Sequence, residues 1–260
     1  MQPRSATTEE YEQFYRDGFV VVRSAFEPAE VRVIAAAFDG LLTTAETLQA
    51  TGMHHGAQFV LERPHGWRTP PVVHRVVWAG AAQPSLLKTG EDPRILRFVA
   101  SLLGSEDMDQ LINQAHFKMP GDGVTFAWHQ DSVHRRYGTD LWRDVNGRGS
   151  YVQALLTIDP MHSGNGPLTV VPGSNQDGHI HPPDRKVLDS GMFAREQAVT
   201  LALDPGDLAF FGPYTVHRSN ANESRQPRRA LINGYAYPGA NSRVYPGEGA
   251  GRRLTAPAAL

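Results

Sequence analysis

Residues 124–131 read VTFAWHQD, a short apolar run that ends in a histidine, a glutamine and an aspartate. Similar short runs, separated by glycine and proline, fill the chain from about residue 110 to residue 237. They are LINQAHFKM (111–119), YVQALLTI (151–158), PLTVV (167–171), AVTLAL (198–203), DLAFF (207–211) and RALINGYAY (229–237). Such runs predict an antiparallel sandwich or barrel, because alternating strands and helices would need longer segments between them. We therefore expect a mainly β fold of the jelly-roll type.

The first part of the chain shows helix signals instead. Thr7 and Glu10 have the spacing of a capping box, which predicts a helix over TEEYEQFYRD (8–17) that ends at Gly18. FVVV (19–22) then predicts a strand.

Two further helices are predicted before residue 110. Pro28 fits the first turn of one, whose apolar residues keep helical spacing. Asp92 is a candidate N-cap for the other, which ends at Gly104. Residues 51–91 show no clear period and are expected to be irregular. We expect one domain over 1–237, with a helical part (about 1–109), a jelly-roll core (about 110–237) and a tail, 238–260, rich in glycine, proline and arginine.

Composition excludes several classes of protein. The 260 residues carry a formal net charge of −2, which argues against a nucleic-acid-binding protein. No stretch is apolar enough for a membrane span or a signal peptide, so a cytoplasmic protein is expected. The chain has no cysteine, which excludes disulfides, iron–sulfur clusters and thiolate metal sites. Histidine and carboxylate side chains must therefore hold any metal.

His129 and Asp131 are the first candidate metal ligands. Side chains alternate along an extended segment, so these two point to one side while Gln130 points to the other. His217, which follows the apolar run DLAFF, could complete a set of two histidines and one carboxylate. That set leaves open positions on an octahedral iron(II), as oxygenases require. A His-x-Asp pair alone is a weak signal, and a surface ion pair is the simpler reading of it.

Arg228 strengthens the oxygenase interpretation. It lies eleven residues after His217, on the next predicted strand, where its side chain would face the same cavity. A guanidinium can bind a carboxylate through two charge-assisted hydrogen bonds. A non-oxidative cupin-like metal-binding isomerase or binding protein is the alternative from another class, and it has no need of this arginine.

The sequence resembles the phytanoyl-CoA dioxygenase (PhyH) superfamily of iron(II)/2-oxoglutarate oxygenases. The matching stretches are DGFVVVRSAFEPAEV (17–31), HFKMPGDGVTFAWHQD (116–131), GNGPLTVVPGSN (164–175), PGDLAFFGPYTVHRSN (205–220) and PRRALINGYAY (227–237). The resemblance implies a double-stranded β-helix in which His129, Asp131 and His217 bind iron. It also implies that Arg228 and Ser219 bind the distal carboxylate of 2-oxoglutarate, with Gln114 and Lys118 as further candidates for that pocket.

The implied reaction uses iron(II), 2-oxoglutarate and O₂, with ascorbate as an optional reductant, and releases succinate and CO₂. Asp131 favours hydroxylation, because the halogenases that resemble this family have Ala or Gly there. Desaturation, epoxidation and cyclisation with the same cofactors remain open. A small metabolite or natural-product intermediate is the expected substrate.

The segment 132–150 follows the first metal ligands and is expected to lie beside the active site. Its arginines outnumber its acids, which favours an anionic substrate, although a solvated surface is the simpler reading. The candidate substrate residues are His134, Arg135 and Tyr137 in this segment, and Phe59 and Trp78 in the stretch predicted to be irregular.

Overall fold

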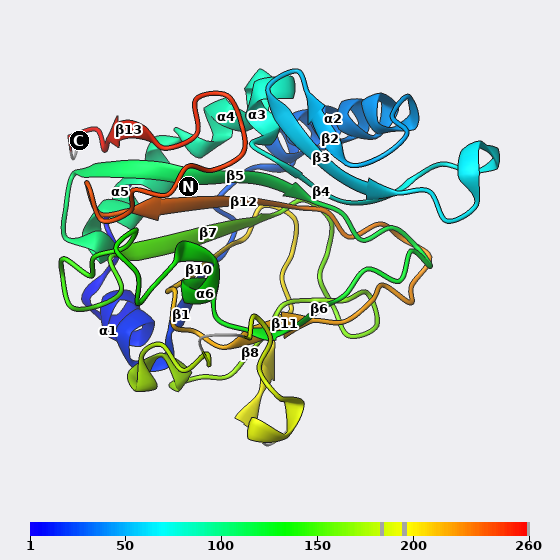
Figure 1. The fold of residues 1–260 in the computed structure, drawn as a ribbon. Helices are drawn as coiled ribbons and strands as arrows, with labels where there is room; N and C mark the ends of the chain where they lie inside the picture. The colour runs from blue at the N-terminus through cyan, green and yellow to red at the C-terminus, as the bar shows by residue number, and fades with distance from the viewer. Residues whose placement is uncertain (183–184, 194–196, 259–260) are drawn as a thin grey trace.

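Figure 1 shows the computed structural model, which describes residues 1–182, 185–193 and 197–258. Two antiparallel sheets face each other. The large sheet has the order β1 (Phe19–Val22), β10 (Leu208–Phe211), β7 (Tyr151–Thr157), β12 (Ala230–Ala236), β5 (Asp107–His116), β4 (Val72–Val77), β3 (Ala57–Glu62) and β2 (Gly52–His54). The small sheet has the order β6 (Phe126–His129), β11 (His217–Ser219), β8 (Thr169–Val170) and β9 (Val199–Thr200). The predicted jelly roll is confirmed.

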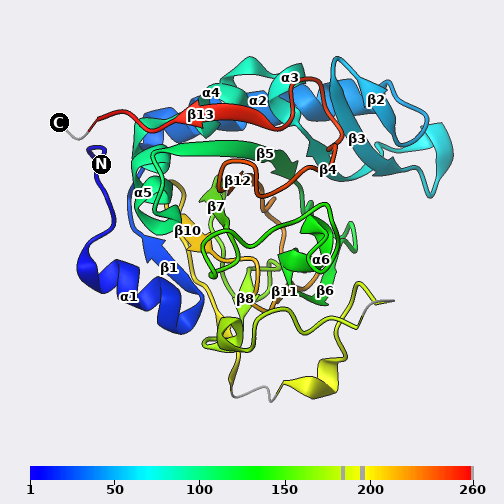
Figure 2. The same ribbon diagram turned by 60° about the vertical axis from the view of Figure 1, so that its left-hand side comes forward.

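The helices that precede β5 in the chain cover the outer face of the large sheet (Figures 1 and 2). They are α1 (Thr8–Asp17), α2 (Pro28–Glu46), α3 (Ala79–Ala82), α4 (Pro84–Gly90) and α5 (Pro93–Leu103). The Thr7–Glu10 capping box and the left-handed Gly18 bound α1 as predicted, and Asp92 caps α5. In the part of the chain that the structure describes, no helix is both long and apolar enough to cross a lipid bilayer.

Strand β12 shows how one sheet serves two cores. All seven of its residues are buried, and successive side chains point to opposite faces. Leu231 and Tyr235 pack with the helices, whereas Ala230, Ile232 and Ala236 face the small sheet. The space between the two sheets is therefore lined by every second residue of each strand.

The stretch 51–91, predicted to be irregular, contains regular structure, so that prediction and the helical assignment of this part of the chain are wrong. β2, β3 and β4 extend the large sheet, and short α3 and α4 follow them. Each strand has only three to six residues. A period of two is hard to recognise in runs this short, particularly where glycine, proline and tryptophan separate them.

The C-terminal segment is not a loosely attached tail. β13 (Arg252–Thr255) pairs with the first half of β5, and the indole Nε1 of Trp78 donates to the carbonyl oxygen of Glu248 at 2.6 Å. Because this segment is held by backbone pairing and by single side-chain contacts, it carries no hydrophobic period that would reveal its packing. It brings Arg243, Tyr245 and Pro246 to the space between the sheets.

Candidate active site

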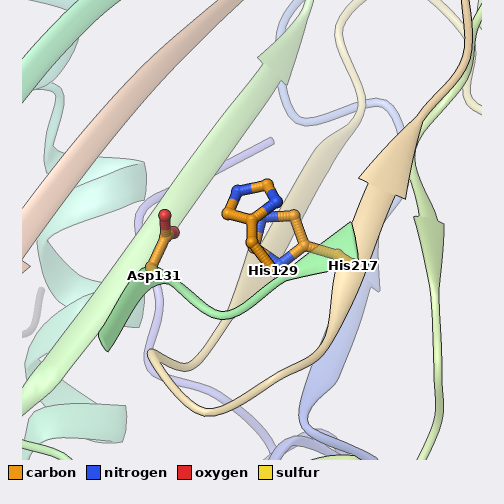
Figure 3. A group of neighbouring side chains, drawn as sticks. All are labelled: His129, Asp131 and His217. Carbon is orange, nitrogen blue, oxygen red and sulfur yellow. The ribbon is translucent and has the colours of Figure 1, made fainter. Parts of the chain in front are cut away.

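His129 and His217 are direct cross-strand partners on β6 and β11. Their ring centroids lie 4.2 Å apart. Gln130 is extended (φ −111°, ψ 143°), so Asp131, the first residue of α6 (Asp131–Arg135), returns to the side of His129. One ligand atom from each of the three residues lies within 4.8 Å of the others, and Figure 3 shows the three side chains together.

Backbone carbonyls orient both imidazoles. The Nδ1 atom of His129 lies 2.8 Å from the carbonyl oxygen of Ala127, and Nδ1 of His217 lies 2.8 Å from that of Thr215. A carbonyl oxygen only accepts, so Nδ1 carries the proton in each ring. Each Nε2 lone pair is therefore free to bind a metal, which is the usual arrangement of histidine ligands.

Asp131 supplies an unsatisfied acceptor to the same point. Its side chain is buried, and Oδ2 has no hydrogen-bond partner within the described residues. Burial alone would raise the pKa of Asp131, but its electrostatic interactions with His217 and with the Arg135 guanidinium outweigh burial and lower it. A buried, ionised and unpartnered carboxylate oxygen is costly unless a cation binds there. With two imidazole nitrogens it makes a donor set that fits iron(II).

The triad opens into a cavity of about 350 Å³ between the two sheets. The large sheet forms one wall of this cavity. A row of residues on five of its strands lines the wall, each residue being the register partner of the next: Gln58, Val77, Gln114, Ile232 and Leu155. Side chains of one row of partners share a face, which explains how residues far apart in sequence line one space.

Arg228 and Ser219, predicted to bind 2-oxoglutarate, both line this cavity and are buried. The guanidinium of Arg228 donates through Nε and Nη2 to the carbonyl oxygen of Gly166, at 3.0 and 2.5 Å. Among the described residues it forms no ion pair, and burial lowers its pKa to about 10. An unpaired buried guanidinium requires an anion nearby, so the cavity is suited to a carboxylate at this position.

The two remaining cofactor candidates differ. Gln114 lines the cavity, and its Oε1 accepts from Nε2 of His116 at 3.0 Å. Lys118 does not line it, contrary to the prediction: its ammonium donates to the carbonyl oxygens of Val124, Ser219 and Asn220. Lys118 therefore holds backbone together behind the cavity and has no donor left for 2-oxoglutarate.

The predicted substrate residues divide in the same way. His134 and Arg135 line the cavity. Tyr137 does not, because its ring stacks on Trp142 with centroids 4.5 Å apart. Phe59 and Trp78 are fully buried elsewhere and were wrongly assigned. Phe59 follows Gln58 on β3, so it points to the opposite face and packs under the helices.

Gln130 joins the two segments that carry the ligands, a role that sequence reasoning missed. Its Nε2 donates to the carbonyl oxygens of Gly178 (2.7 Å) and Tyr214 (2.6 Å), and its Oε1 accepts from the Ile180 amide (2.9 Å). Its own amide donates to Nε2 of His181 at 2.9 Å. His181 is thus engaged with the backbone, and nearby His179 contacts the Ser132 hydroxyl at 2.7 Å, so both histidines are structural. The place of a glutamine between two predicted ligands is the signal that the sequence offers for this network.

The model of the family "Phytanoyl-CoA dioxygenase (PhyH)" matches residues 14–230. This match covers most of the chain, including all three triad residues and Arg228. The chain belongs to this family. The resemblance drawn from the sequence motifs is therefore confirmed.

Individual relatives agree with this assignment. The chain is similar to the methylphosphonate hydroxylase of Gimesia maris (strain ATCC 29201 / DSM 8797 / 534-30), with 30% identity over 185 residues; the match covers 69% of this chain and 61% of the relative. The chain thus spans less than two thirds of that protein. Among solved structures, EvdO2 from Micromonospora carbonacea var. aurantiaca, complexed with 2-oxoglutarate, has a TM-score of 0.68 at 22% identity and matches 94% of this chain and 97% of its own. EctD from S. alaskensis with bound Fe has a TM-score of 0.68 at 21% identity, covering 91% and 79%. These two show the shared fold.

Proposed function

We propose that this protein is an iron(II)/2-oxoglutarate-dependent dioxygenase that hydroxylates a small organic molecule. One observation carries the proposal: the metal-binding triad and an unpaired buried arginine, Arg228, line the same cavity. The triad alone would suit many metal enzymes. A buried cation in the same cavity suits the second carboxylate of a dicarboxylate such as 2-oxoglutarate, bound beside the metal.

Each residue has a distinct part in this function. His129, Asp131 and His217 would hold iron on one face. Arg228, with the Ser219 hydroxyl, would bind the distal carboxylate of 2-oxoglutarate and so orient its 2-oxo acid end toward the metal. When bound, iron and 2-oxoglutarate supply the oxidation, in which a C–H bond, O₂ and 2-oxoglutarate become a C–OH group, succinate and CO₂.

Apolar side chains form part of the wall of the cavity that contains Arg228 and the triad. Leu155, Leu168, Phe211 and Ile232 line the cavity, and the Phe211 ring lies 4.9 Å from that of His217. These groups offer no proton and no hydrogen bond, and they keep bulk water from the reacting centre. They also lower the local dielectric, which strengthens the contact between Arg228 and a carboxylate.

The substrate is proposed to be a small acid. The cavity volume of about 350 Å³ is at the small end of ligand pockets. Asp131 is the only acidic residue among its lining residues in the described chain, against five arginines. The name of the relative from Gimesia maris, a methylphosphonate hydroxylase, makes small phosphonates the first compounds to examine.

Product analysis under ¹⁸O₂ tests the proposal. The protein, iron(II) and 2-oxoglutarate are incubated with methylphosphonate and other small acids, and succinate is measured together with label in the product. Succinate formation coupled to one labelled oxygen atom in the product supports hydroxylation. Succinate together with an unlabelled product that is desaturated or cyclised would support the proposed cofactors. It would show that the reaction is desaturation or cyclisation and not hydroxylation. Absence of succinate under all conditions, with iron bound, would refute the oxygenase assignment.

A further inference from the structure

Arg75 is a cavity-lining cation that the proposed function does not yet use. It lies on β4, where its register partner on β5 is His116. The ring of His116 in turn packs against Phe126 on β6, the strand that ends in His129, with centroids 5.4 Å apart. Arg75 therefore lies on the inner face of the large sheet, on the wall that faces the metal-ligand strand.

Arg75 has no partner within the described residues. Among the hydrogen bonds, ion pairs and ring contacts of the described chain, none involves its guanidinium, although the side chain is only partly exposed. Burial lowers its pKa. A half-buried guanidinium without an acceptor loses hydration and regains nothing from the protein, so a ligand is the remaining source of compensation.

The other arginines of the cavity are already engaged. Arg228 bonds to Gly166, Arg218 lies over the Trp128 ring at 4.6 Å, and Arg135 lies between the rings of Tyr151 and Tyr245. Arg243 donates to the carbonyl oxygen of His134. Arg75 is thus the one cavity arginine, in the described chain, for which neither a hydrogen bond, an ion pair nor a ring contact is seen.

Charge counting at the loaded site points the same way, and this step rests on the proposed function. Iron(II) with Asp131 carries one net positive charge, 2-oxoglutarate carries two negative charges, and Arg228 contributes one positive charge, which leaves that group neutral. Arg75 then remains, with Arg135, Arg218 and Arg243, as positive charge that no acidic residue lining the described cavity compensates, so the loaded cavity still favours an anion. Gln58 adds a second source of donors, because it lies on the same face of the adjacent strand, diagonal to Arg75.

From these observations we infer that Arg75, assisted by Gln58, forms a subsite that binds the acid group of the substrate, separate from the Arg228 site for 2-oxoglutarate. The ligand class is a small organic acid with a carboxylate, sulfonate or phosphonate group. A planar guanidinium fork can pair two oxygens of any of these groups, so the charge and not the central atom is the common feature.

Calorimetric binding to the anaerobic enzyme loaded with iron(II) and 2-oxoglutarate tests this subsite. The probes are acetate, methanesulfonate and methylphosphonate, with uncharged dimethyl methylphosphonate as the matched neutral compound. The wild-type protein is expected to bind at least one acid and not the neutral ester, and the preferred acid identifies the group. Arg75→Gln should weaken that binding by about tenfold or more, because charge-assisted hydrogen bonds are lost.

Matched variants separate the subsite from general charge and from folding. Arg75→Lys keeps the charge and should bind the acid more weakly than wild type but more tightly than Arg75→Gln. Arg136→Gln removes the same charge from an exposed position in the nearby segment and should leave binding unchanged. The affinity for 2-oxoglutarate should be unchanged in all three variants, which also shows that they are folded.

Three results overturn the inference. The first would be that no acid binds the loaded wild-type protein. The second would be that the neutral ester binds as tightly as the acids, and the third that Arg75→Gln binds the acids as tightly as wild type does. If the wild-type protein binds iron but not 2-oxoglutarate, it is the proposed function that fails, so the two failures are distinguishable.

Discussion

His129 and His217 occupy directly opposed positions on β6 and β11, and each ring is oriented by the carbonyl oxygen two residues before it. Two of the metal ligands are therefore a cross-strand pair, and the same local hydrogen bond orients both of their rings. Asp131 joins from the same strand end after one extended residue. Backbone pairing thus sets the positions of the two histidines, and the extended Gln130 sets the position of Asp131.

Removal of either histidine should abolish metal binding. In His129→Ala or His217→Ala, one imidazole and the proper geometry are lost, and the remaining two ligands cannot hold iron(II) on one face. Iron per protein, measured after gel filtration of anaerobically loaded protein, should fall from about one to near zero. His65→Ala, an exposed histidine outside the site, is the control and should retain iron. Full iron occupancy in both triad variants would mean that the metal lies elsewhere.

Replacement of Arg228 should separate iron binding from 2-oxoglutarate binding. Arg228→Ala is expected to keep iron and to raise the dissociation constant for 2-oxoglutarate by about ten- to a hundredfold, because a charge-assisted contact is lost in a buried site. Calorimetry on the iron-loaded protein measures this constant. Arg225→Ala, exposed and three residues away, should have no effect. An unchanged constant in Arg228→Ala would exclude Arg228 as the carboxylate site.

Gln130→Glu should disturb the site without a change in size. A carboxylate cannot donate to the carbonyl oxygens of Gly178 and Tyr214, and each unsatisfied buried group costs about 1–3 kcal/mol. The free energy of unfolding should fall accordingly in urea titrations. Iron affinity should fall about tenfold or more, as for other residues that orient metal ligands.

Gln176→Glu is the matched control for that variant. The amide of Gln176 also donates to backbone carbonyls, those of Tyr15 and Arg16, but at an exposed position outside the cavity. It should lower stability slightly and leave iron affinity unchanged. Equal iron affinities in wild type and Gln130→Glu would show that Gln130 is only structural.

Gly247→Ala should test the contribution of the C-terminal segment. Gly247 has φ +120°, and a Cβ atom there would lie 2.1 Å from Cβ of Trp78. The strain should lower the free energy of unfolding by about 1–3 kcal/mol. It should also displace the C-terminal segment, whose Arg243 and Tyr245 line the cavity. Thermal unfolding and binding measurements should show lower stability and weaker acid binding, with unchanged iron affinity.

Gly251→Ala isolates the clash in that experiment. Gly251 also has a positive φ (+84°), but nothing lies within 4 Å of the position of its Cβ. Gly251→Ala should therefore lower stability only by the cost of placing an alanine at a positive φ. If Gly247→Ala matched Gly251→Ala in acid binding, the C-terminal segment would not be needed at the cavity.

The sequence predicted what depends on local signals. The capping box at Thr7, the helix stops at glycine and the alternation around Gln130 are all decided by neighbours in the chain, and all are seen in the structure. The triad could be proposed because a strand with a His-x-Asp end is recognisable and because His217 follows another predicted strand; the family resemblance then supported the set.

Features that depend on pairing between distant strands could not be predicted. Arg75 joins the cavity only because β4 pairs with β5, and Phe59 leaves it only because Gln58 takes the inner face of β3. Lys118 was misjudged for a similar reason, since two of the three carbonyls it binds, those of Ser219 and Asn220, lie about a hundred residues further along the chain. Strand register over long separations is not encoded in any local pattern.

The most direct test of the central claim is anaerobic titration of the metal-free protein with iron(II) and then 2-oxoglutarate, followed by visible absorption. A 2-oxo acid that chelates ferrous iron through two oxygens produces a weak charge-transfer band. The band is expected to appear only when both are present, to saturate at one equivalent of each, and to be absent in His217→Ala. If wild-type protein binds iron but shows no band at saturating 2-oxoglutarate, the oxygenase assignment is contradicted.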